Sequence, residues 1–167
     1  MKRSTPYKRK KSGKTNYKKR LTLLLSHKAR IVIRKSNKNI QAHLVQYHEN
    51  GDRTIACSHS RQLTKYGWKN SRSNTPAAYL VGYLLGCKAA KKKIKEAVAD
   101  LGLYQSTKGN KLYAVIRGAS DAGLNVPHSE ECIPSKDRIA GKHMESYQKK
   151  QIEQDFEKVK EQIKNDR

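Results

Sequence analysis

The chain has 167 residues, of which 35% are hydrophobic, and a formal net charge of +23. So few apolar residues predict a modest core, with part of the chain outside it. The whole charge excess lies in the first half: residues 1–95 hold 25 Lys and Arg against two acids, Glu49 and Asp52, whereas residues 96–167 hold 12 of each sign. A half-chain that repels itself this strongly predicts a polyanionic partner, usually nucleic acid. An anionic membrane is the competing partner, but the basic segment has no bulky apolar face to insert.

The three cysteines, Cys57, Cys87 and Cys132, are far apart and include no C-x-x-C pair. This spacing argues against a disulfide framework or a structural zinc site and favours a reducing, cytoplasmic setting. The N-terminus lacks the apolar stretch of a secretory signal, and the apolar run 77–87 is too short to cross a membrane. We therefore expect no metal, no cofactor and no membrane partner.

Residues 1–20 contain ten Lys or Arg, with Tyr7 and Tyr17 between them. Such a segment cannot bury enough apolar surface to fold alone. We expect an arm that folds onto RNA, with its cations on phosphates and its tyrosines stacking or hydrogen bonding. A solvated tail or a localisation signal is the alternative. Leucines at positions 21 and 23–25 predict a short helix that ties the arm to the domain.

Three strand-like stretches follow the arm, with β-branched or alternating apolar residues. They are residues 30–34, 40–47 and 53–58. In the second stretch, Ile40, Ala42 and Leu44 share one face. Asn50-Gly51 predicts a tight hairpin between the second and third strands.

Two polar loops are candidate RNA contacts. The turn 35–39 presents cations and amides together, so it is either a phosphate contact or a solvated hairpin tip. The loop 61–73 holds the one tryptophan of the chain, Trp68, which either plugs the loop into the core or faces RNA. We favour the plug, keep Trp68 among the RNA candidates, and assign the cations of this loop to the RNA backbone.

Residues 73–91 predict a buried core helix around which the chain is organised. Asn74 or Thr75 can cap it, and Pro76 suits its first turn. Small residues recur at every fourth position, namely Ala78, Gly82, Gly86 and Ala90. Since a helical Gly costs about 0.8–1 kcal/mol relative to Ala, this row predicts close approach to a sheet or to a second backbone.

Residues 97–101 then predict a short buried strand, and residues 112–123 a second helix. The order β-β-β-α-β-α predicts a single α/β domain in which helices cover a mixed sheet. We divide the chain into three parts: a basic RNA-binding arm and anchor (1–27), an α/β core domain (28–125) and a C-terminal extension with helices (126–167).

Within the extension, residues 136–147 predict a short helix, and the last segment repeats apolar residues at a narrow helical spacing. The repeated residues are Ile152, Phe156, Val159 and Ile163, on an otherwise charged helix. We expect this stripe to dock on a partner or a ribonucleoprotein surface, or to fray where none is present.

An enzyme has to be considered, because nucleases of the ribonuclease-H type share this element order. Two-metal phosphoryl hydrolysis needs clustered carboxylates, yet the first strand offers Arg30 and Arg34, and Asp100 stands alone. The six histidines show no paired-ligand spacing, and no phosphate-binding glycine loop occurs. We predict that the chain is not an enzyme. The alternatives are a nucleic-acid-processing enzyme of ribonuclease-H-like topology and a non-specific DNA-binding protein.

Several segments, in one order, resemble the archaeal type of the large-subunit ribosomal protein L-eighteen family, whose eukaryotic counterpart is called L-five. They are Tyr7 with 13–20, the strand and turn 32–38, the loop 65–69, the helix start 73–80, and 123–129. The similarity extends from about Tyr7 to about Tyr147. The resemblance implies binding of 5S ribosomal RNA and contacts to 23S ribosomal RNA. It also implies a place in the central protuberance beside other ribosomal proteins, including ribosomal protein L-five of the bacterial and archaeal naming.

The candidate RNA-binding residues come from the arm, the first strand and its turn, the loop before the core helix, and the turn before the second helix. In the arm they are Lys2, Arg3, Tyr7, Lys8, Arg9, Lys10, Lys11, Lys14, Thr15, Tyr17, Lys18, Lys19 and Arg20. In the remainder they are Arg30, Arg34, Lys35, Ser36, Asn37, Lys38, Arg61, Lys65, Trp68, Lys69, Arg72, Asn74, Lys108 and Lys111.

Overall fold

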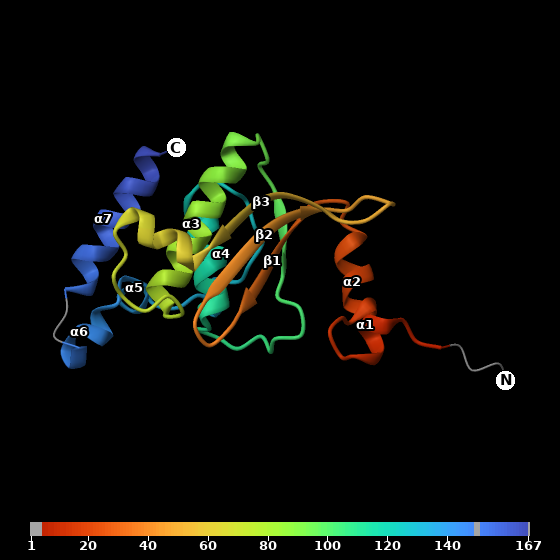
Figure 1. The fold of residues 1–167 in the computed structure, drawn as a ribbon, viewed down its shortest axis with the longest axis horizontal. Helices are drawn as coiled ribbons and strands as arrows, with labels where there is room; N and C mark the ends of the chain where they lie inside the picture. The colour runs from red at the N-terminus through yellow and green to blue at the C-terminus, as the bar shows by residue number, and fades with distance from the viewer. Residues whose placement is uncertain (1–4, 149–150, 167) are drawn as a thin grey trace.

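A computed structural model describes residues 5–148 and 151–166, so the candidates Lys2 and Arg3 lie outside the described residues. Two helices form the arm, three strands and a 3-10 helix follow, and helices alternate with one more strand up to the C-terminal region (Figure 1). The elements are α1 (Lys8–Lys11), α2 (Tyr17–Leu24), β1 (Ala29–Lys35), β2 (Ile40–Gln46), β3 (Arg53–His59), η1 (Ser60–Tyr66), α3 (Thr75–Lys91), β4 (Ala97–Asp100), α4 (Lys111–Asp121), η2 (Glu130–Cys132), α5 (Lys136–Ala140), α6 (Lys142–Gln148) and α7 (Ile152–Asn165).

The four strands form one mixed sheet in the order β3-β2-β1-β4. β2 pairs antiparallel with β1 and β3, whereas β1 and β4 are parallel; α3 lies in the connection from β3 to β4. The alternation predicted for β2 is confirmed, because Ile40, Ala42 and Leu44 are buried. Ile31 and Ile33 of β1 lie opposite Leu44 and Ala42 on the same face. The predicted α/β architecture with a mixed sheet is therefore confirmed.

α3 is the core helix that the sequence predicts. The Asn74 side chain accepts a hydrogen bond from the Ala77 N–H at 3.0 Å, and Pro76 lies in the first turn, where its missing donor costs nothing. Every residue from Pro76 to Cys87 is buried, because the helix is covered by the sheet, by α4 and by α7. Such a helix needs apolar residues all around, in contrast to the single stripe of a surface helix.

The small residues of α3 allow a close contact with α4. A Cβ built on Gly82 would lie 1.9 Å from the Val115 carbonyl oxygen, and one built on Gly118 of α4 would lie 2.1 Å from the Tyr79 oxygen. The two backbones therefore touch at Gly82 and Gly118 from opposite sides. Of the two neighbours that the sequence leaves open for this row, the second backbone is the one found.

The C-terminal region differs from the prediction in two ways. The helix expected over 136–147 is two helices, because Gly141 between α5 and α6 adopts a φ of +95°, which ends the first helix. The prediction that the apolar stripe of α7 docks on another molecule or frays is wrong. It packs on the core: Ile152, Phe156, Val159 and Ile163 are 0%, 7%, 2% and 1% exposed.

The leucine anchor of the arm is also not as predicted. α2 forms, but Leu21 and Leu25 remain 62% and 68% exposed, and no residue of Tyr17–Leu24 is buried. Figure 1 shows α7 and α3 on one side of the sheet and the arm helices α1 and α2 at the opposite end of the molecule. The acid-free arm and the mixed-charge C-terminal helix thus lie far apart.

Candidate nucleic-acid interface

The face of the sheet turned away from α3 carries polar side chains and supports the arm. Arg30 and Arg34 of β1 alternate with the buried isoleucines, so they project from this open face. Between the arm and the open face lies a hollow of about 280 Å³. It is lined by Arg9, Lys14, Thr15, Asn16, Lys19, Arg20, Leu23, Arg30, Val32, Arg34, Val45, Asp52, Thr54, Asp100, Gly102 and Leu103.

The arm is built from two short helices with polar ends. The Asn16 side chain caps α2 by accepting a hydrogen bond from the Lys19 N–H at 3.1 Å. The rings of Tyr7 and Tyr17 contact each other with centroids 5.2 Å apart, and Arg9 Nε donates to Thr15 Oγ1 at 2.9 Å. The cations Lys8, Lys10, Lys11, Lys14 and Lys18 are exposed. The arm thus has local order but keeps most of its charge in solvent.

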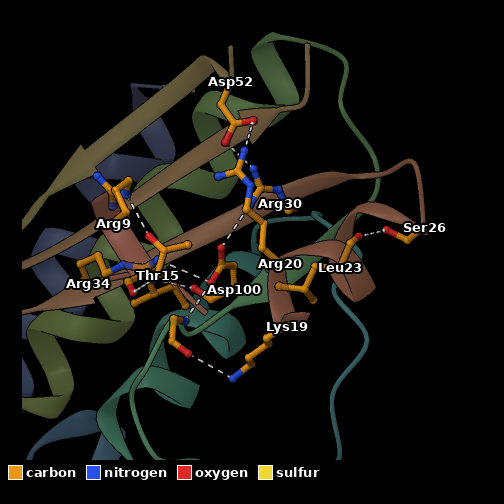
Figure 2. A network of polar contacts seen from close by, with 12 residues as sticks. Arg9, Thr15, Lys19, Arg20, Leu23, Ser26, Arg30, Arg34, Asp52 and Asp100 are labelled. Atoms are coloured by element: carbon orange, nitrogen blue, oxygen red, sulfur yellow. Dashed lines mark hydrogen bonds and ion pairs between the residues drawn. The ribbon is translucent and has the colours of Figure 1, made fainter. Parts of the chain in front are cut away.

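Ion pairs connect the arm, the loop between β2 and β3, and strands β1 and β4 (Figure 2). Asp52 accepts from Arg20 of α2 at 2.9 Å and from Arg30 at 2.6 Å. Asp100 pairs with Arg30 at 3.2 Å and with Arg34 at 3.5 Å. The two carboxylates thus alternate with three guanidinium groups. Asp100 has the structural role that its isolation in the sequence predicts.

Two of the candidate RNA contacts lie in the interior, which corrects their assignment. Arg30 is 2% exposed, and its guanidinium is held by Asp52 and Asp100. Trp68 is 2% exposed, and its indole N–H donates to the Ser71 carbonyl at 3.1 Å. Neither side chain can reach a phosphate or stack on a base, and Trp68 is the plug that the sequence analysis favours.

The turn between β1 and β2 is a compact cationic tip. The Ser36 hydroxyl donates to the Asn39 carbonyl at 3.0 Å, and the Ser73 hydroxyl donates to the Asn37 carbonyl at 2.8 Å, which holds the turn against the start of α3. Lys38 is exposed at the tip. The turn therefore offers charge on a fixed backbone, as a phosphate contact requires.

Tyr104, in the loop after β4, is a neighbour of this turn that sequence reasoning missed. Its hydroxyl donates to the Lys35 carbonyl at 2.6 Å, and the Lys35 ammonium lies 5.3 Å from its ring centroid. Lys35, Tyr104 and Lys111 line a second hollow, of about 380 Å³. Burial, and then the charge of Lys35, lowers the pKa of Lys111. An anion in this hollow would reduce the repulsion between the two lysine ammonium groups. The sequence alone gives no signal for Tyr104, because the parallel pairing of β1 with β4 is what brings it to the turn.

The loop before α3 presents a second group of cations. His59 caps η1 by accepting from the Arg61 N–H at 3.0 Å, and Gly67, at a φ of +80°, ends it. Arg61, Lys65 and Lys69 are exposed, and Arg72 is half-buried. Two hydrogen bonds hold this loop against the C-terminal helix: Tyr66 donates to Asp166 at 2.7 Å, and Asn70 donates to Asp155 at 3.1 Å.

The structure does not bring the candidates into one group: those of the arm and Arg34 surround the open face, whereas the loop 61–73 packs against α7. Lys108 lies apart, in an ion pair of 2.6 Å with Glu131. The Asn74 side chain is engaged as the cap of α3. His43, on the open face, has a pKa lowered by burial and then by His59 and Arg34, so it is a weaker cation than a free histidine.

The search for a metal centre concerns the residues that the structure describes. Within 5–148 and 151–166, no three His, Cys, Asp or Glu side chains are placed to hold a metal ion. Among those same residues, no helix is long and apolar enough to cross a bilayer. The fold and its surface define a class of protein: an α/β domain whose distinctive feature is a cationic arm and loops around an open sheet face.

Comparison with known proteins identifies the family. A family model described as "Ribosomal large subunit proteins 60S L5, and 50S L18" matches residues 2–97 and 89–129. The chain is 44% identical over 158 residues to the large ribosomal subunit protein uL18 of Methanococcus maripaludis, an alignment that covers 95% of this chain and 81% of the relative. The chain belongs to this family of large-subunit ribosomal proteins, which are structural components of the cytoplasmic ribosome and not enzymes.

Proposed function

We propose that this protein binds 5S ribosomal RNA and helps attach it to 23S ribosomal RNA in the central protuberance. Ribosomal protein L-five, in the bacterial and archaeal naming, is a proposed neighbour there. Membership of the large-subunit family supports a ribosomal role, and the resemblance of the arm, turn and loops supports the choice of RNA.

One observation carries the proposal. In the described part of the arm, residues 5–20, every charged side chain is a cation, because this segment contains no Asp or Glu. No residue of α1 or α2 is buried. Folding of the domain gives no reason for such a segment, whereas an RNA backbone does. The turn at Lys38 and the loop cations Lys65 and Lys69 add exposed positive charge outside the arm.

Deletion of residues 1–20 tests the proposal, because it removes ten cations and, among the described residues 5–20, no buried side chain. We expect weaker binding of 5S RNA and a shallower salt dependence. For duplex contacts, log K changes by about 0.9 per unit of log salt for each phosphate neutralised. The melting temperature should stay close to that of the full chain.

The competitor in this experiment is duplex DNA of matched length at the same salt concentration. A full chain that prefers 5S RNA supports the proposal. Equal affinity for both would favour a non-specific nucleic-acid binder instead. If the truncated chain keeps the full affinity and the full salt slope, the arm is not part of the RNA interface.

A further inference from the structure

The first 95 residues contain two carboxylates, and they have different surroundings. Both belong to the loop between β2 and β3, at Glu49 and Asp52. Glu49 is exposed, and among the described residues it forms no ion pair. The Asp52 side chain is 23% exposed and accepts from Arg20 Nη2 and Arg30 Nη2. Glu49 therefore faces solvent, whereas Asp52 neutralises two arginines.

The contact that Asp52 makes is the main polar link between the arm and the domain. Residues Tyr17–Leu24 bury no side chain, so apolar packing holds α2 only weakly. Besides Arg20 to Asp52, the link from α2 to the core is Lys19 Nζ, which donates to the Gly102 carbonyl at 3.2 Å. Without the carboxylate, Arg20 and Arg30 would face each other as like charges, and attraction at this contact would become repulsion.

The same contact determines the shape of the hollow. Its walls come from the arm, from the open sheet face and from the loop after β4 (Figure 2). Gly102 fits there because its φ is +64° and a Cβ would lie 2.8 Å from the Arg34 guanidinium carbon. The hollow thus exists in this form only while α2 is held against the sheet.

We propose that Asp52 is a positioning residue that docks the basic arm on the open face of the sheet, so that the arm meets RNA already oriented. This inference rests on the proposed function and adds that one acid in the basic half increases RNA affinity. Simple electrostatics gives the opposite sign, because removal of a negative charge should help a protein bind a polyanion. Docking works through entropy: an arm that is ordered before binding loses less freedom on the RNA.

The test compares Asp52→Asn with Glu49→Gln, which remove the same charge from the same loop. In the RNA-free protein, hydrogen exchange of the α2 amides should quicken by about tenfold in Asp52→Asn, because local opening becomes easier, and should not change in Glu49→Gln. At one salt concentration, Asp52→Asn should bind 5S RNA about tenfold more weakly than Glu49→Gln, through the lost preorganisation.

Unchanged α2 exchange in Asp52→Asn would overturn the proposal. So would faster exchange with RNA affinity equal to or above that of Glu49→Gln, since docking would then not matter for binding. If no variant prefers 5S RNA, the proposed function fails, while the exchange measurement still decides whether Asp52 docks the arm.

A second pair of variants covers the possibility that Asp52→Asn unfolds the domain by leaving Arg30 with one partner. Arg20→Gln keeps the Arg30–Asp52 pair and removes only the arm side of the contact. Lys18→Gln on the same helix removes an exposed cation. Both should weaken RNA binding, but only Arg20→Gln should quicken α2 exchange in the free protein; equal exchange in the two would contradict the docking role.

Discussion

The arm helix α2 and the C-terminal helix α7 attach to the same domain by opposite means. α7 buries four apolar side chains, spaced four, three and four residues apart, and packs mainly on α3. α2 carries leucines at 21, 23 and 24 and buries none of them. α2 is held by an ion pair to Asp52. In addition to the apolar contact of α7, Asp155 and the neighbouring Asp166 accept hydrogen bonds from Asn70 and Tyr66.

This difference shows how charge and apolar spacing divide the work in one chain. A helix with mixed charges and a regular stripe can become part of the core, because the stripe gains from burial and the charges stay on the outer face. A helix whose charges all have one sign repels a cationic neighbour and needs an anion to dock. The first kind supplies stability, and the second kind is held in place by an acid of its own chain while its other cations stay free for RNA.

The largest effect is expected at the helix on which α7 rests. Gly82→Leu places side-chain atoms where a Cβ alone would lie 1.9 Å from the Val115 oxygen. Since backbone cannot yield as a flexible side chain can, we expect a loss of about 3 kcal/mol or more, the upper end for overpacking. Urea denaturation measures it, with Glu161→Leu on the exposed side of α7 as the control. A stabilised Gly82→Leu protein would mean that α3 and α4 do not touch.

The next effect separates the two terminal helices directly. Phe156→Ala removes a ring that is 7% exposed and lies 5.4 Å from the Tyr79 ring, so the free energy of unfolding should fall by about 3 kcal/mol. Leu21→Ala removes a side chain that is 62% exposed and should change the same free energy by less than about 0.5 kcal/mol. Similar losses at the two sites would show that the arm is part of the core.

A smaller effect concerns RNA rather than stability. Lys38→Glu places an anion at the tip of the β1–β2 turn, against the proposed phosphate contact, whereas Lys158→Glu makes the same change on the exposed side of α7. We expect Lys38→Glu to weaken 5S RNA binding by about 1–2 kcal/mol and Lys158→Glu to have little effect. Melting temperatures should stay similar. If the two reversals cost the same binding, RNA does not distinguish the two ends of the molecule.

The smallest effect is a titration at the end of α7. The hydrogen bond that Tyr66 donates to Asp166, followed by burial, raises the pKa of Tyr66 to about 12. Because this pKa is raised above the ordinary value of 10.0, the contribution of the bond to stability is fully present below pH 10 and is lost as the pH rises toward 12. Asp166→Asn should move the Tyr66 phenolate absorbance back toward pH 10. Tyr66→Phe identifies the signal, and an unchanged titration in Asp166→Asn would rule out the bond.

Much of the fold follows from local patterns in the sequence. The alternation in β2 and the capped apolar run of α3 predict these elements and their buried faces, because each depends on neighbours within one turn or one strand. The glycine row predicts a close backbone contact but not which backbone, since Gly118 lies more than thirty residues away along the chain. The stripe of α7 gives the buried face but not its partner, which is α3 of the same chain and not another molecule.

The candidate site was predictable by charge but not by burial. Acid-free stretches identify the arm, the turn and the loop, because a repulsive segment has few alternatives to a polyanion. Arg30 also lies in the cation-rich half of the sequence, yet it is buried, because Asp52 and Asp100 pair with it from two other segments. The sequence favours the buried position of Trp68 but gives no sign of Tyr104, because the fold decides which aromatic side chain lies beside the turn.

The parallel pairing of β1 with β4 also imposes an order of assembly. Arg30 is 22 residues from Asp52 but 70 residues from Asp100. A chain made from its N-terminus can close the shorter loop first, and the longer loop costs more entropy to close. In a nascent chain that ends before residue 100, Arg30 can therefore pair with Asp52 but not yet with Asp100. We expect β4 to be the step that ends this exposed interval, so shielding of the basic segment from stray nucleic acid would matter most before β4 is synthesised.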